Sequence, residues 1–158
     1  MIKCILWTIS TANPCLWFSY AIIVLTLKQE LVTLLTSNTT FKPSELQVIG
    51  VNSNDPDYEG EGFENMVRFA KEYKINFPYL IDDSQDVARA YGAVCTPDPF
   101  LLDIEHKLVF HGRINDALEP GMTPNIPIME SNVRKVLHGE KIEKDFDPSI
   151  GCSIKWKN

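Results

Sequence analysis

Apolar side chains recur every three or four residues in several segments, a spacing that gathers them on one face of a helix. The first such segment is 28–35, and it is followed by a predicted loop at Ser37–Thr40. Asp82 and Gln85 have the spacing of a capping box, which predicts a helix that opens there and stops at Gly92. The apolar positions, in chain order, are Leu31, Leu34 and Leu35; Phe63, Met66, Val67 and Ala70 in a helix over 63–73; Val87 and Tyr91; and Val133, Val136 and Leu137 in a last helix ended by Gly139.

Short apolar runs between these helices predict strands. Leu46–Val51 is typical of a buried strand, and Phe77–Ile81 predicts a second, shorter one. Phe100–Leu102 and Leu108–Phe110 flank a largely polar segment, which indicates a β-hairpin. The acidic loop Asn52–Gly62 is expected on the surface. Helices that alternate with strands in this way predict an α/β fold with a mixed sheet.

The first 27 residues have a different pattern, because Lys3 is their one charged side chain and 24 uncharged residues follow it. That length could cross a bilayer or serve as a signal sequence. Asn13–Pro14 interrupts the run, Thr8, Ser10 and Thr11 dilute it, and no clean small-residue cleavage site follows. A buried strand followed by the start of a helix is the second interpretation.

Composition and charge exclude several classes of protein. The 158 residues are 44% hydrophobic and 23% charged, as in one globular domain. Twenty-one acidic and 15 basic side chains give a net charge of −6, so nucleic acid is not expected as a partner. There is no Cys-x-x-Cys, and the three histidines lack the spacing of metal ligands, so we predict neither a metal nor a cofactor. The four cysteines are Cys4, Cys15, Cys95 and Cys152.

A series of short sequence motifs in a fixed order identifies a family more specifically than the order of helices and strands does. The chain resembles the thioredoxin-like proteins of the alkyl hydroperoxide reductase and thiol-specific antioxidant (AhpC/TSA) family over roughly residues 28–158. The matching pieces are Val51–Asp55, Glu64–Met66, Phe69–Ala70, Phe77–Leu80, Val87–Ala93, Cys95–Asp98 and Pro148–Lys157. The resemblance implies a thioredoxin-like α/β fold, in which Pro97 follows a cis peptide bond and the backbone before it pairs with the extended chain of a substrate.

In that family the chemistry lies in a Cys-x-x-Cys-Pro motif at the N-terminus of the first helix, where the helix dipole stabilises a thiolate. Counting back from Lys28 places the two cysteine positions near Phe18 and Ala21, and neither residue can be a redox nucleophile. Cys15 is close, but it has no partner at the required spacing. The motif is therefore missing from this chain.

A shift of reading frame would explain the missing motif. Tyr20–Thr26 can be encoded as TAT GCC ATC ATT GTC CTT ACC, and from its third base this string reads Cys-His-His-Cys-Pro-Tyr. The codons upstream then give an apolar Met-Val-Phe-Leu. We hypothesise that residues up to about Leu27 are an out-of-frame translation of the strand and its motif. The second shifted cysteine falls two or three residues too close to Leu31, as a small deletion would leave it.

Three residues are candidates for a site. Pro97 is expected to be the cis-proline, and Cys95, two residues before it, is either an auxiliary thiol or a small buried hydrophobe. Cys152 in the C-terminal tail could pair with Cys95, act as a redox thiol, or be inert.

Some polar residues are weaker candidates. Asp98 and Arg113 could contact a substrate but are expected to be surface charges. Asn52, Ser53 and Asn54 follow a strand at the end where α/β proteins place sites, although a polar loop is the ordinary interpretation.

The resemblance implies a thiol-disulfide oxidoreductase or peroxiredoxin-like antioxidant enzyme, with a disulfide or peroxide as substrate and a thiol as reductant. Without the motif we expect catalysis to be impaired. The alternative is a non-catalytic thioredoxin-fold binding module tethered by the apolar segment 4–27. We predict three parts: the apolar segment 1–27, a thioredoxin-like domain over 28–147 and a tail over 148–158. A cytoplasmic location is predicted, with membrane anchoring or export as the alternatives.

Overall fold

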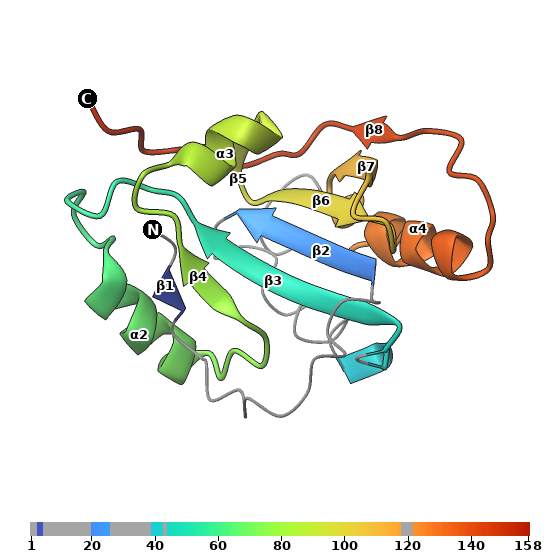
Figure 1. Cartoon of the computed structure of the whole chain (residues 1–158), viewed down its shortest axis with the longest axis horizontal. Helices are drawn as coiled ribbons and strands as arrows, with labels where there is room; N and C mark the ends of the chain where they lie inside the picture. The colour runs from blue at the N-terminus through green and yellow to red at the C-terminus, as the bar shows by residue number, and fades with distance from the viewer. Residues whose placement is uncertain (1–2, 5–19, 26–38, 43, 118–121) are drawn as a thin grey trace.

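A mixed sheet of seven strands crosses the molecule, and its helices cover both faces (Figure 1). The computed structural model describes residues 3–4, 20–25, 39–42, 44–117 and 122–158. Its elements are β1 (Lys3–Cys4), β2 (Tyr20–Leu25), β3 (Leu46–Asn52), α2 (Phe63–Glu72), β4 (Tyr79–Ile81), α3 (Asp86–Tyr91), β5 (Cys95–Thr96), β6 (Asp98–Leu102), β7 (Leu108–Gly112), α4 (Ile128–Leu137), β8 (Phe146–Asp147) and β9 (Cys152–Ser153).

The strand order is β1-β4-β3-β2-β6-β7-β8, which places β2 at the centre of the sheet. β2 runs parallel to β3 and antiparallel to β6, with Leu25 opposite Asp98. The parallel and antiparallel pairs confirm the predicted mixed sheet. A second, two-stranded sheet joins β5 to β9 near the C-terminus.

The apolar N-terminal stretch thus supplies a central strand along its described part, as the strand interpretation expected. Ala21 pairs with Gln47 on one side and Leu102 on the other. The count that put a cysteine position at Ala21 is therefore wrong, because the middle of a strand is not a helix N-terminus. Across the described residues, no helix combines the length and the hydropathy needed to span a bilayer. Cys15 and Phe18 lie outside those residues.

Alternation along β3 divides the core into two clusters, since successive side chains of a strand point to opposite faces. Leu46 and Val48 belong to the larger cluster, which includes residues of α2 and α4. Val51 belongs to the smaller one, with Ala88 of α3 and Ile154 of the tail. Each face of the sheet thus has its own apolar core.

Helices α2 and α4, strand β3 and the β6–β7 hairpin confirm the elements predicted there, and the helix predicted over 28–35 lies outside the described residues. Thr39 and Thr40 are helical and not a loop. The predicted capping box is also wrong, because α3 begins only at Asp86 and the side chain of its N-cap residue, Gln85, makes no capping hydrogen bond. The Asp82 carboxylate instead accepts the Ala88 N–H in the first turn. Gln85 has a left-handed φ of 63°, and its amide is used elsewhere, as shown below.

Candidate functional site

The loop between β5 and β6 contains a cis peptide bond between Thr96 and Pro97, as the family resemblance implied. β6 begins at Asp98, which lies opposite Leu25 at the end of β2. The chain that leaves β2 therefore starts beside Pro97. In α/β proteins, sites form at such carboxyl ends of parallel strands.

Cys95 lies just before this loop and is 9% exposed. Its thiol donates a hydrogen bond to the Pro97 carbonyl oxygen at 3.5 Å. Burial, and secondly the charge of Asp98, raise the pKa of the Cys95 thiol to about 11. The thiolate is the nucleophilic form, so at neutral pH Cys95 is held in its unreactive form.

Cys152 lies in β9 and is exposed. Register places Cys152 opposite Thr96, and Ser153 opposite Cys95. Directly opposed residues of an antiparallel pair share a face, and neighbours along a strand do not. Cys95 and Cys152 therefore lie on opposite faces of this small sheet, and both thiols are free. A bond between them would require the two strands to be rearranged.

Asp98 is fully buried, which corrects the expectation of a surface charge. One carboxylate oxygen, Oδ1, lies 2.7 Å from His111 Nε2 and accepts a hydrogen bond from the Ser149 hydroxyl at 2.9 Å. The other accepts the Val94 backbone N–H at 3.1 Å. The His111 ring stacks on Phe100, with centroids 4.2 Å apart. This buried carboxylate connects the residue before β5, strand β7 and the tail. Sequence reasoning missed the contacts of both His111 and Ser149, although Ser149 lies in the matching piece Pro148–Lys157.

Arg113 is half-buried and holds the segment after α4 rather than facing solvent freely. Its Nε donates to the Pro148 carbonyl at 3.2 Å and lies 3.6 Å from Asp147 Oδ1. Arg113 also lines a small pocket of about 20 Å³ together with Pro97 and Ser149. Its guanidinium is therefore near the cis-proline, but its observed contacts are structural.

The C-terminal tail is hydrogen-bonded across the ends of β3 and α3 by side chains that are themselves buried. Asn54 Oδ1 accepts the Lys155 N–H at 3.0 Å. The Gln85 side chain, which has no solvent exposure, donates to the Ser53 and Lys155 carbonyls at 2.7 and 2.8 Å. Gln85 Oε1 also accepts the Lys157 N–H at 2.9 Å.

These contacts change the interpretation of two sequence features. Asn52, Ser53 and Asn54 are buried, at 2%, 1% and 5% exposed, so the loop predicted to be on the surface begins only after them. Asp82 accepts the Ser53 hydroxyl at 2.9 Å and the Ala88 N–H at 3.0 Å. Asn54 thus holds the backbone of the tail, which is about 100 residues away along the chain, and Asp82 holds the loop that contains Ser53.

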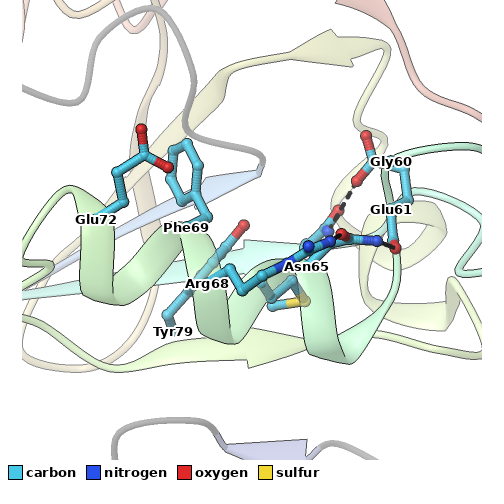
Figure 2. A pocket seen from close by; sticks show the side chains of 9 residues that line it. Gly60, Glu61, Asn65, Arg68, Phe69, Glu72 and Tyr79 are labelled. Carbon is cyan, nitrogen blue, oxygen red and sulfur yellow. Dashed lines mark hydrogen bonds between the residues drawn. The ribbon is translucent and has the colours of Figure 1, made fainter.

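A separate cleft of about 230 Å³ opens beside α2. Figure 2 shows the Tyr79 hydroxyl pointing into the space between Glu72 and Asn65. Tyr79 is 3% exposed. Burial, and secondly the charge of Glu61, raise the Tyr79 pKa, so this hydroxyl is a neutral donor.

Short polar contacts shape the rim of this cleft. Asn52 Nδ2 donates to Glu61 Oε2 at 3.2 Å, and Asn65 is hydrogen-bonded to both the Glu61 carbonyl and Arg68. The cleft could hold a small polar molecule on these groups. Among the residues described, no three His, Cys, Asp or Glu side chains gather as a metal site would need.

The chain is similar to several known proteins. The model of the AhpC/TSA family matches residues 26–111. The thiol-disulfide oxidoreductase ResA of Bacillus thuringiensis is 28% identical over 82 residues, which are 45% of this chain and 47% of that protein. The chain thus matches about half the length of this curated relative.

Two solved structures superimpose on the chain. An uncharacterised conserved protein from Geobacillus kaustophilus is 31% identical, with a TM-score of 0.81 over 89% of this chain and 78% of that one. A thiol-disulfide isomerase from Corynebacterium glutamicum is 15% identical, with a TM-score of 0.63 over 85% of this chain and 90% of that one. At that identity the second likeness shows the fold alone, which is thioredoxin-like.

Proposed function

The chain belongs to the AhpC/TSA family, and from this premise we propose that it is a thiol-disulfide oxidoreductase or peroxiredoxin-like antioxidant protein whose catalysis is impaired in the sequence as it stands. One observation carries the proposal. β2 ends at Leu25, beside the cis-proline, and the sequence from Thr26 to Val94 contains no cysteine. The position from which a family thiol would reach a substrate at Pro97 is therefore without sulfur.

The chemistry of an intact relative defines what is missing. A thiolate attacks one sulfur of a substrate disulfide, forms a mixed disulfide and releases the other sulfur as a thiolate. A second cysteine then attacks the mixed disulfide, which releases the reduced substrate and leaves a disulfide in the protein for a thiol reductant to reduce. With a peroxide, the first thiolate attacks one oxygen, the O–O bond breaks, and the other oxygen leaves as an alcohol or water while the sulfur becomes a sulfenic acid. The second thiol then condenses with the sulfenic acid, which forms a disulfide and releases water. Both routes need two cysteines within reach of each other.

The two described thiols do not meet this requirement. The pKa of Cys95 is raised to about 11, so very little of it is thiolate at pH 7. Cys152 is exposed, but it lies on the opposite face of the β5–β9 pair. A peroxide or disulfide could react with Cys152, but neither of these thiols would resolve the product in this arrangement.

The same observations favour a second candidate, a thioredoxin-fold binding module without turnover. Its tether would be the apolar segment 4–27, of which the structure describes Cys4 and 20–25. β1 and β2 place Cys4 and residues 20–25 of that segment in the sheet, so these residues are not available as a tether. A cytoplasmic location stays a prediction.

Two measurements test the proposal together. The coding DNA is read across codons 14 to 30 in all three frames, and the chain as given is assayed for turnover of a small disulfide substrate with a thiol reductant. We expect a Cys-His-His-Cys-Pro-Tyr sequence in the shifted frame. We also expect the chain as given to turn over no faster than its Cys95→Ser/Cys152→Ser variant.

The chain expressed in the restored frame is the matched comparison, and we expect it to turn over at least tenfold faster than the chain as given. Turnover by the chain as given that disappears in Cys152→Ser would show that catalysis is intact, against the proposal. Codons that do not encode the motif, together with no turnover in either chain, would favour the binding module.

A further inference from the structure

A groove of about 550 Å³ lies at the end of the sheet away from the cis-proline. One wall is the turn between β6 and β7, and the other is the end of α4 with the segment that follows it. β6 runs from Asp98, beside the cis-proline, to Leu102 at the groove end, and Figure 1 shows the β6–β7 hairpin beside α4 there. The groove is therefore separate from the candidate site around Pro97.

The side of the groove nearest the core is apolar. Val109, Val136 and Ile142 line it, are half-buried, and pack against the larger core cluster. Ile104 and Leu108 line the groove beside them, and each is 51% exposed. Large apolar side chains that stay half in water on a concave surface are typical of a binding site.

Ile104 is an unusual residue for its place in the chain. It lies in a tight turn, in which the Asp103 carboxylate accepts the N–H groups of Glu105 and Lys107 at 2.8 and 2.9 Å. Turns favour residues that relax the backbone or bond to it, such as glycine, proline, asparagine, aspartate and serine. Isoleucine does neither, so its side chain is available for a contact outside the turn. The hydrogen bonds of Asp103 fix the turn, which reduces the entropy that a partner's binding would cost.

The rim of the groove is acidic. Its described lining residues include four carboxylates and one ammonium group, on Asp103, Glu105, Glu140, Asp145 and Lys141. Glu105 is paired with Lys107 at 2.5 Å on the turn, and Glu140 and Asp145 are exposed on the other wall. Negative charge around an apolar surface attracts a ligand that carries positive charge on an apolar body.

Charge also distinguishes between occupants of the groove. A second copy of this chain has a net charge of −6, and a membrane surface carries anionic lipids, so the acidic rim would repel both. A segment of another protein that combines lysine or arginine with aliphatic residues would match the rim and the apolar side together. The aliphatic stems of its basic side chains would follow the apolar wall while their charged ends reach the carboxylates.

We propose that this groove is a docking site for a basic, amphipathic segment of a partner protein, which places aliphatic side chains on Ile104 and Leu108 and cationic side chains beside Glu140 and Asp145. The groove is at the opposite end of β6 from Pro97, so a partner bound here leaves the candidate site accessible. This inference goes beyond the proposed function and does not depend on it, because the groove would hold its partner with or without disulfide turnover.

The experiment measures binding of a labelled peptide, Gly-Lys-Leu-Lys-Leu-Lys-Gly, by fluorescence anisotropy at low salt. We expect Ile104→Ser/Leu108→Ser to weaken binding at least about tenfold, because it removes the exposed apolar contacts. Glu140→Gln/Asp145→Asn should weaken binding by a similar factor, because it removes two carboxylates from the rim. This second variant changes only exposed side chains, so it decides the outcome if the first does not fold.

Matched variants elsewhere on the surface control for general changes of charge and hydrophobicity. Asp57→Asn/Glu59→Gln removes the same charge from exposed positions of the acidic loop, and Met122→Ser/Ile126→Ser removes two other exposed apolar side chains. Both should bind the peptide like the unchanged protein. A peptide with serine in place of leucine should bind at least about tenfold more weakly, and one with glutamate in place of lysine should not bind.

Amide chemical shifts measured by NMR localise the peptide. Those of residues 103–109 and 136–145 should change during the titration, and those of the acidic loop 52–62, which also contains four carboxylates, should not. No saturable binding, groove variants that bind like the controls, or shifts spread equally over both acidic regions would overturn the proposal.

Sedimentation tests the other occupant of the same chemistry as this chain. The unchanged protein and Ile104→Ser/Leu108→Ser should sediment alike without peptide. A dimer of the unchanged protein that Ile104→Ser/Leu108→Ser abolishes would assign the groove to a second copy and overturn the proposal. Binding of the unchanged protein to vesicles of anionic phospholipid that is lost in the same variant would assign it to a membrane and overturn the proposal as well.

Discussion

The two faces of the sheet are held by different kinds of interaction. On the face covered by α2 and α4, the larger core cluster is built from apolar side chains such as Val48, Met66 and Phe110. On the face covered by α3 and the tail, the apolar cluster is small, and buried polar side chains, Gln85 and Asp98 among them, connect distant segments. Figure 1 shows the tail passing along the α3 side of the sheet.

The difference shows what each kind of interaction provides. Burial of apolar area is not directional, so it stabilises the first face without specifying one arrangement of loops. Hydrogen bonds are directional and costly to leave unmade, so the second face specifies where the cis-proline, β5 and the tail lie. The candidate site is therefore on the face where the position of each backbone group is specified.

Truncating the larger core should produce the largest effect. Phe110 is 1% exposed, and Phe110→Ala leaves a cavity, so we expect a loss of about 3–5 kcal/mol in the free energy of unfolding. Urea denaturation measures it. Phe146→Ala is the matched control, because Phe146 is 50% exposed and should cost about 1 kcal/mol or less. Equal losses would contradict the assignment of the main core to this face.

The next largest effect should be the difference between the alkylation rates of the two thiols. A Cys95 pKa of about 11 leaves very little thiolate at pH 8, and Cys95 is buried whereas Cys152 is exposed. Alkylation at Cys95 should therefore be at least about tenfold slower than at Cys152. Peptide mapping after timed iodoacetamide treatment measures both rates. Similar rates would show that Cys95 is accessible.

The same pKa predicts a dependence of stability on pH. The folded state keeps the neutral thiol of Cys95, so its contribution is fully present below pH 9 and is lost as the pH rises toward 11. Urea midpoints at pH 8 and pH 10.5 should differ less in Cys95→Ala than in the unchanged chain. Cys152→Ser should keep the full difference.

The tail network should respond to a change of a single atom. Gln85→Glu replaces the amide that donates to two carbonyls with an acceptor, so we expect a loss of about 2 kcal/mol and faster hydrogen exchange at residues 155–157. Gln47→Glu is the control, since Gln47 donates to its neighbour Val48 and is half-exposed. A Gln85→Glu chain with an unchanged tail would refute the proposed role of this side chain.

Loss of a surface ion pair should have the smallest effect on the free energy of unfolding. Glu130 and Arg134 lie one turn apart on α4 at 2.7 Å, and the Arg134 side chain is 52% exposed. Glu130→Gln should change the free energy of unfolding by less than about 0.5 kcal/mol, and less still at high salt. A loss as large as that of Gln85→Glu would mean that exposed charges, and not only buried polar groups, position this part of the fold.

Local pattern predicted much of the fold. The apolar spacing of Met66 and Ala70 predicted α2, and the run from Leu46 predicted β3, because hydrophobic periodicity is a property of neighbouring residues. The cis-proline was predicted through a family resemblance, and the structure contains it. The capping box failed because Gln85 has a stronger set of partners in the tail, about 70 residues away in sequence.

The sequence by itself determined the alternation of helices and strands, the family, and the absence of a Cys-x-x-Cys pair. Only the tertiary structure decided that Asp98 is buried beside His111, that Gln85 holds the tail, and that Cys95 and Cys152 lie on opposite faces of one small sheet. The physical reason is distance along the chain. Periodicity and spacing report neighbours in sequence, whereas burial and hydrogen bonding depend on segments that meet only after the sheet has formed.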